Sequence, residues 1–271
     1  MLNRFTLELT RLFIFVFLCF FLFISPSTWA ENKAWQSTHY IMNSFVEIAL
    51  NNEYSAEKSP LRKWQNSIIY TIKHRTADHA LHQQITELHL QHLSRITGLS
   101  ISPAQSGQTA NLTIIFSSEK DLSLELSTDF PLQDKQHIAA LSRHSVCLAH
   151  FSINENKSIK QAIVIIPVDR ARAHAKLLSC VIEELTQIMG LPNDSDNVHP
   201  SIFNDHSVND YLSGLDFLLL KLLYHPQLKV GMSQQQVLTE LNTIIPSKPF
   251  QQLIQQSEQV VNQYGLYPLL N

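Results

Sequence analysis

Apolar residues along the chain fall at helix spacing in some stretches and at strand spacing in others. Residues 36–53 and 78–97 place apolar side chains three and four positions apart, and Gly98 follows the second stretch, which predicts two amphipathic helices. Short apolar or alternating runs predict strands at 63–73, 111–118, 145–153 and 160–169. A long helix is expected next, from about Arg172 to Met189, because apolar spacing continues until Gly190.

The C-terminal part carries further helix signals. Ser213 and Asp216 form an S-x-x-D pattern, which predicts a capped helix start before a Leu-rich stretch. Residues 233–244 and 249–263 are rich in Gln and predict two more helices. This order of helices and strands indicates an α+β fold with a helical C-terminal subdomain.

The first thirty residues differ from the rest. Arg4 and Arg11 precede an apolar run, Leu12–Ile24, and small residues follow up to Ala30, a pattern typical of a secretory signal peptide. An uncleaved N-terminal anchor is the alternative. We therefore expect a periplasmic or secreted protein of residues 31–271, with no membrane segment after cleavage. Its net charge moves from −3 to −4 when Arg4, Arg11 and Glu8 are removed, and such a mildly acidic chain does not favour nucleic-acid binding.

Two cysteines remain after the predicted signal, Cys147 and Cys180. An even number of cysteines in an exported chain predicts a disulfide between them. The alternative is a catalytic Cys/His arrangement.

The stretch Cys180–Asp194 carries the candidate chemistry. On a helix, Cys180, Glu183, Glu184 and Gln187 share one polar face, opposite an apolar face. Such a face is often simply solvated. The stretch also has the outline of H-E-x-x-H-x-x-G-x-x-H, the zinc-binding helix of metalloproteases.

In that outline the three positions of the histidine ligands hold Glu183, Gln187 and Asn193. The position of the general base holds Glu184, and the position of the glycine holds Gly190. Ser201 and Phe203 resemble the S-x-M-x-Y turn that lies under the metal in metzincins, with Phe203 in the Met position. The strand at 160–168 stands where these enzymes carry the edge strand that binds substrate. The chain thus resembles the zincin, and more loosely the metzincin, metalloprotease fold.

That resemblance implies a small mixed sheet packed on two long helices. The zincin-like domain would span 31–231, and residues 232–271 would be its helical extension. Most of the chain after the signal also resembles a family of exported bacterial proteins of unknown function. Its signature combines E-E-x-x-Q-x-L-G-L-x-N-D with P-S-I-F-N-D, and here only Met189 departs from the first motif, where it replaces Leu.

The residue types at the ligand positions argue against ordinary zinc proteolysis. The amides of Gln187 and Asn193 are weak ligands, and Asp194 is the only nearby substitute in the motif. Oxygen ligands favour hard ions such as calcium or magnesium. A divalent metal therefore stays a candidate cofactor, and His199 or His206 would have to return from the following loop to supply nitrogen.

Three functional hypotheses follow. The first is an exported pseudo-protease whose cleft binds a peptide or protein. The second is a metal-dependent peptidase with non-standard ligands and Glu184 as general base. The third is a purely structural part of the cell envelope, in which the acidic face only stabilises the fold.

Overall fold

The computed structural model describes residues 33–51, 59–130, 134–204, 206 and 210–270. The predicted signal peptide, residues 1–30, lies outside the described residues. The described residues from Ala34 onward form one compact unit. Within the described residues, no helix has both the length and the apolar character needed to cross a membrane.

A five-stranded mixed sheet forms the centre of this unit, with strands in the order β2-β1-β3-β5-β4. The first four are parallel, and β4 runs antiparallel to β5 at one edge. The strands are β1 (Ile68–His74), β2 (Ile101–Pro103), β3 (Leu112–Ser117), β4 (Leu148–Ile153) and β5 (Ile159–Pro167). A mixed sheet with helices agrees with the predicted α+β class.

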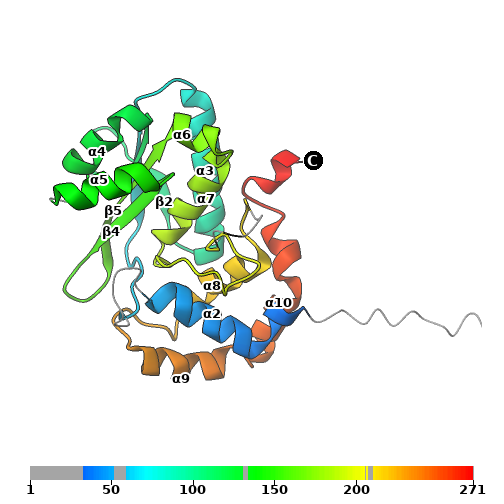
Figure 1. Ribbon diagram of the computed structural model, residues 1–271. Coiled ribbons are helices and arrows are strands. Elements are labelled where there is room, and N and C mark those ends of the chain that lie inside the picture. The colour runs from blue at the N-terminus through cyan, green and yellow to red at the C-terminus, as the bar shows by residue number, and fades with distance from the viewer. Residues whose placement is uncertain (1–32, 52–58, 131–133, 205, 207–209, 271) are drawn as a thin grey trace, which may run out of the picture. The chain divides into compact units, whose positions relative to one another are not determined.

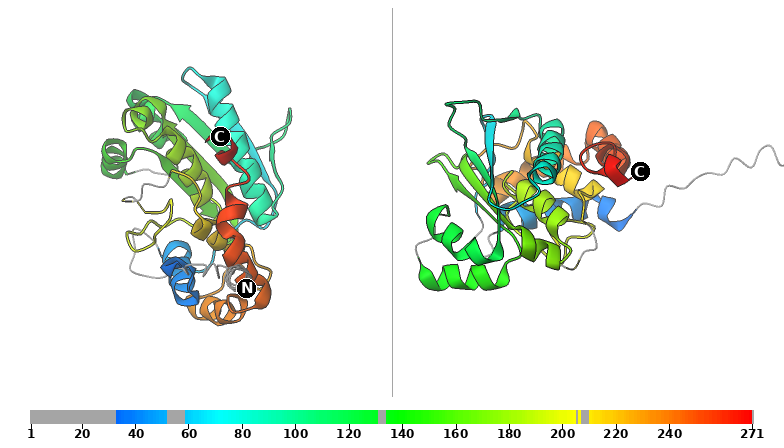
Figure 2. Two further views of the ribbon diagram at one scale, coloured as in Figure 1. Left: turned by 90° about the vertical axis from the view of Figure 1, so that its right-hand side faces the viewer. Right: turned by 90° about the horizontal axis from the view of Figure 1, so that it is seen from above.

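Helices cover both faces of the sheet (Figures 1 and 2). Helices α3 (His79–Thr97) and α7 (Leu177–Gln187) lie on one face, and α4 (Leu122–Thr128) and α5 (Lys135–His144) lie on the other. The alternation of side chains along a strand produces two cores. On β3, for example, Ile114 and Phe116 join the large core, whereas Ile115 joins a smaller one under α4.

The remaining helices pack together beyond the end of the sheet. They are α2 (Thr38–Leu50), α8 (Gly214–Leu223), α9 (Gln234–Ile244) and α10 (Lys248–Val261). The 3-10 turns are η1 (Ala34–Gln36), η2 (Glu119–Asp121), which contacts α4, and η3 (Tyr267–Leu270). Helix α8 is almost entirely buried and contacts α2, α3 and α10. The predicted S-x-x-D start of α8 is confirmed, because the Ser213 and Asp216 side chains form a reciprocal capping box.

Two sequence predictions about this region are wrong. The helix expected from Arg172 to Met189 is instead α6 (Val168–Ala173) followed by α7, because Ala175 adopts a left-handed conformation with φ of 55° and breaks the helix. The strand predicted at 160–168 is not an edge strand. It is β5, which pairs with β3 on one side and with β4 on the other, so β4 occupies the edge.

Candidate functional site

A cleft of about 700 Å³ lies between the edge strand β4 and helix α7. One wall is the segment from Leu141 to Phe151, and the other is one face of α7 with the turn that follows it. Residues of α7 at spacings of three and four line the cleft because these positions share a helix face. The residues that line the cleft include Arg62, Cys147, Ala149, Phe151, Cys180, Glu183, Glu184, Gln187 and Asp194.

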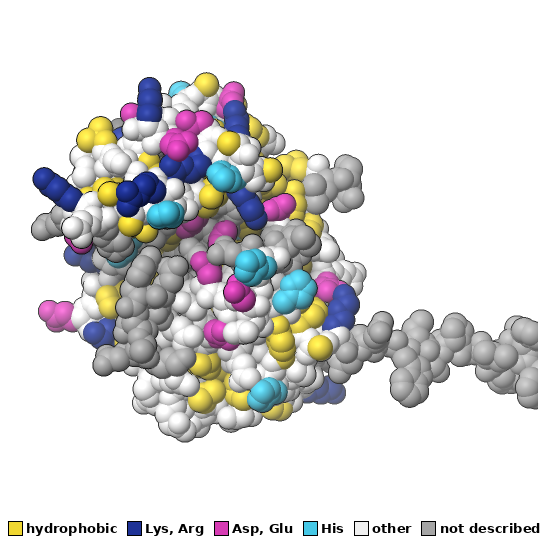
Figure 3. Space-filling model, viewed as in Figure 1, with side chains coloured by type: hydrophobic (Ala, Val, Ile, Leu, Met, Phe, Trp, Pro, Cys, Tyr) yellow, Lys and Arg dark blue, Asp and Glu magenta, His cyan; other side chains and the backbone are white. Residues whose placement is uncertain are grey.

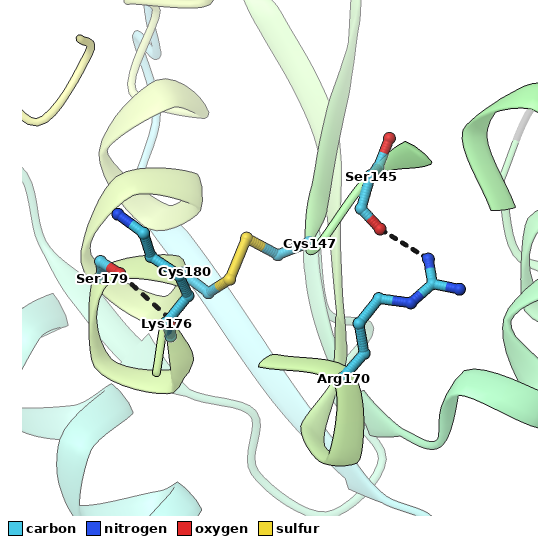
Figure 4. Close-up of a disulfide and its surroundings, with 6 residues drawn as sticks. All are labelled: Ser145, Cys147, Arg170, Lys176, Ser179 and Cys180. Carbon is cyan, nitrogen blue, oxygen red and sulfur yellow. Dashed lines mark hydrogen bonds between the residues drawn. A yellow bond between two sulfur atoms is a disulfide. The ribbon is translucent and has the colours of Figure 1, made fainter. Parts of the chain in front are cut away.

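The predicted disulfide is confirmed, and it connects the two walls of the cleft (Figure 4). Cys147 precedes β4, Cys180 lies on α7, and their Cα atoms are 5.8 Å apart. On the strand side, the guanidinium of Arg170 donates to the carbonyl oxygens of Ser142 and Ser145 at 2.7 and 2.8 Å, which fixes the segment that leads to Cys147. The disulfide and Arg170 therefore set the position of one cleft wall relative to the other.

The cleft brings together four of the residues that the sequence singled out: Glu183, Glu184, Gln187 and Asp194. Glu184 is 6% exposed, whereas Glu183 and Gln187 are partly exposed. The Gln187 side-chain amide donates to Asp194 Oδ1 at 3.0 Å. In the protease outline, Gln187 stands at the position of the second ligand, and Asp194 is the expected substitute for the third. The hydrogen bond therefore connects two candidate ligand positions.

Asn193 and His199 are placed elsewhere. Asn193 is 7% exposed, and its side-chain amide donates to the backbone oxygens of Glu47 at 3.1 Å and Asp194 at 2.9 Å. Asn193 therefore ties the turn after α7 to the end of α2. The His199 side chain is exposed and does not line the cleft, and the backbone of His199 bonds to the Tyr40 hydroxyl.

The segment with Ser201 and Phe203 is held by a buried carboxylate. The Ser201 hydroxyl donates to Asp216 Oδ1 at 2.6 Å and accepts from the Phe203 backbone N–H at 3.1 Å. Ser201, Phe203 and Asp216 are completely buried. Burial raises the pKa of Asp216 to about 6, although hydrogen bonds from Ser201, Ser213 and Ile202 act in the opposite direction. Neither Ser201 nor Phe203 lines the cleft, so both contribute by holding the loop in its conformation.

Acidic side chains gather near the centre of the face shown in Figure 3. Among the described residues, however, no group of at least three His, Cys, Asp or Glu side chains is arranged to hold a metal ion. On α7 and the turn after it, the cleft is lined by carboxylates and by Gln187, whose amide nitrogen donates to Asp194, while His144 and His150 line the opposite wall. The carboxylates and amides at the ligand positions of the protease outline do not fit zinc, which prefers imidazole and thiolate ligands.

Sequence analysis did not identify Arg62 or the backbone of β4 as parts of the site. Arg62 enters the cleft from the segment before β1, and the guanidinium lies 5.4 Å from the centre of the Phe151 ring. A lone arginine between a leucine and a lysine gives no signal in a single sequence. The role of β4 depends on strand order, which local periodicity does not report.

Comparisons with known proteins agree with one part of the second resemblance, namely that the chain belongs to a family of unknown function. A family model described as "Protein of unknown function (DUF2927)" matches residues 38–243. No curated protein matches the chain. Because the family model covers most of the 271 residues, the chain belongs to this family, DUF2927.

Proposed function

We propose that the cleft between β4 and α7 binds an extended peptide or protein segment, and that the protein is a non-catalytic relative of zincin-like proteases. In this proposal the peptide adds as a further strand to the edge of the sheet. Peptide recognition by strand addition uses the unpaired backbone groups of an edge strand and the pockets beside it.

The orientation of the β4 backbone carries this proposal. The Ala162 N–H of β5 donates to Asn111 on the β3 side, so the backbone groups of the next residue, Ile163, point toward β4. Ile163 is opposite His150 in the antiparallel register, which directs the backbone groups of His150 toward β5. The neighbouring residues Ala149 and Phe151 therefore direct their N–H and C=O groups toward the free edge.

The free edge opens onto the cleft. Among the described residues, none forms a backbone hydrogen bond with Ala149 or Phe151 at this edge. Both residues line the cleft, opposite the polar face of α7. An extended peptide paired with them would lie against Glu183 and Glu184, in the arrangement that the zincin resemblance implies for a substrate.

The absence of fitting ligands favours binding over metal-dependent hydrolysis. The Asp194 carboxylate already accepts a hydrogen bond from the Gln187 amide nitrogen, and Asn193 does not line the cleft but holds the turn after α7. The disulfide between Cys147 and Cys180 favours an oxidising compartment, which supports the periplasmic or secreted location expected from the N-terminal segment.

Binding is tested with the full disulfide-bonded chain and a pool of short, end-blocked, fluorescent peptides of extended conformation, measured by anisotropy. We expect saturable binding that is lost in Ala149→Pro, because proline removes an N–H from the free edge and leaves the bonds of β4 with β5 intact. Circular dichroism and the melting temperature confirm that the variant folds. Equal binding by Ala149→Pro and wild type would contradict strand addition.

Hydrolysis with Glu184 as general base is the second candidate. The position of Glu184 in the cleft wall favours it, because a general base must reach the bound substrate. Mass spectrometry of the same peptides after incubation, without chelator, detects cleavage. Products formed by wild type and absent with Glu184→Gln would replace the binding proposal with this one, and elemental analysis would then identify the metal.

A further inference from the structure

Arg62 lies in a segment that is fixed from both sides. The Leu61 N–H donates to the Met232 carbonyl oxygen at 2.9 Å, and the Leu61 carbonyl oxygen accepts from Gly231 at 2.8 Å. On the other side, the Lys63 ammonium donates to the carbonyl oxygens of Leu223 and Leu228 at 2.8 and 2.7 Å. Next along the chain, the Trp64 indole N–H donates to the Ile188 carbonyl oxygen at 2.8 Å.

The Arg62 side chain takes no part in this anchoring. Its Nε and Nη2 atoms are buried and have no hydrogen-bond partner. Within the described part of the chain, no carboxylate forms an ion pair with Arg62. Burial lowers the pKa of Arg62 from its ordinary value, and among the described residues the guanidinium has a compensating contact with the face of the Phe151 ring.

A cation in this position destabilises the folded state as long as no ligand is bound. Buried N–H donors without acceptors and a partly buried charge without a counter-ion both disfavour the folded state. Methionine, with similar length and no charge, would fill the same space without these costs. The hydrogen-bonded segment around Arg62, its lack of a protein counter-ion among the described residues and its place in the cleft lining therefore indicate that Arg62 serves a ligand rather than the fold.

We propose that Arg62 recognises a carboxylate of the bound peptide, next to the peptide residue that pairs with Phe151. This inference rests on the proposed strand addition, because the backbone of Phe151 faces the free edge and its ring lies beneath the guanidinium. A planar guanidinium binds a carboxylate through parallel hydrogen bonds, which makes it selective for this group. The carboxylate can belong to an acidic side chain or to a peptide C-terminus.

The test compares short end-blocked peptides that carry Glu at one position with otherwise identical peptides that carry the uncharged isostere Gln. A further pair, with free or amidated C-terminus, distinguishes a terminal carboxylate from a side chain. By anisotropy, wild type should bind one carboxylate peptide about tenfold or more tightly than its neutral partner. In Arg62→Met this preference should vanish.

Arg143→Gln is the matched control, because it removes one positive charge from an exposed position of α5 that does not line the cleft. It should keep the wild-type preference for the carboxylate peptide. Equal affinity of wild type for both members of every pair, or an unchanged preference in Arg62→Met, would overturn the role of Arg62 while leaving strand addition intact.

If none of the peptides binds, strand addition fails, and the carboxylate site is decided separately by NMR. N-acetylglutamate amide should shift the Arg62 Nε–H signal, assigned by its loss in Arg62→Met, and N-acetylglutamine amide should not. No shift at saturating concentration would overturn the proposal. The melting temperature adds an independent check: Arg62→Met should melt no lower than wild type, and a clear decrease would show that Arg62 serves the fold.

Discussion

Reduction of the disulfide between Cys147 and Cys180 should loosen both the fold and the cleft. The bond spans a sequence separation of 33 residues. In the chain-entropy model, closing a loop of this length lowers the entropy of the unfolded chain enough to stabilise the folded state by about 3.5–4 kcal/mol. For a domain of this size, such a loss corresponds to a decrease in melting temperature of roughly 7–15 °C.

The measurement is thermal unfolding by circular dichroism, with and without a non-thiol reductant. The Cys147→Ser/Cys180→Ser variant is the control, because it should melt near the reduced wild type and show no response to reductant. Cys180, which is 1% exposed, and Cys147 lie on opposite walls of the cleft. Because their disulfide holds these walls together, the reduced protein should also bind peptides more weakly. Two reactive thiols in protein from an oxidising compartment, or an unchanged melting temperature on reduction, would refute this reasoning.

Two further changes test the packing. Gly190 has φ of 116°, and a Cβ there would collide with a backbone carbonyl oxygen, so Gly190→Ala should cost roughly 3 kcal/mol or more in urea unfolding. Gly107→Ala should cost only about 1–2 kcal/mol, because Gly107 also has positive φ but open space around it; equal losses would contradict the collision. Burial lowers the pKa of His82 to about 4 and of His89 to about 3. The contribution of these two histidines to stability is therefore complete above about pH 6.5 and is lost as the pH falls toward 4. Asp216, with its raised pKa, has the opposite effect, and the loss from the two histidines outweighs it. The urea midpoint should decrease between about pH 7.5 and about pH 5, and a constant midpoint would contradict this account.

Features that depend on neighbouring residues could be predicted from the sequence. The helix predicted at 78–97 is α3, because its apolar spacing is regular and Gly98 adopts the left-handed conformation that ends a helix. The capped start of α8 follows from the S-x-x-D pattern. The disulfide followed from cysteine number and expected export, without knowledge of the fold.

Features that depend on the assembled sheet could not be predicted in this way. The periodicity of 160–168 describes a buried strand, but it does not tell which strands lie beside it, so the edge was assigned to β5 instead of β4. Apolar spacing across Arg172–Met189 also conceals the break at Ala175, because an alanine gives no local signal for the left-handed conformation that it adopts. The polar face of α7 is visible in the sequence, whereas Arg62, which lines the same cleft, is not.

Hydrogen exchange at the edge of the sheet tests the central claim most directly. Residue-resolved NMR would follow the backbone amides of β4 while the peptide pool is added to the disulfide-bonded protein. Strand addition predicts strong new protection of Ala149 and Phe151, and little change at Leu148 and His150, whose amides already face β5. Saturating peptide without protection of Ala149 and Phe151, or equal protection of all four amides, would contradict binding at this edge.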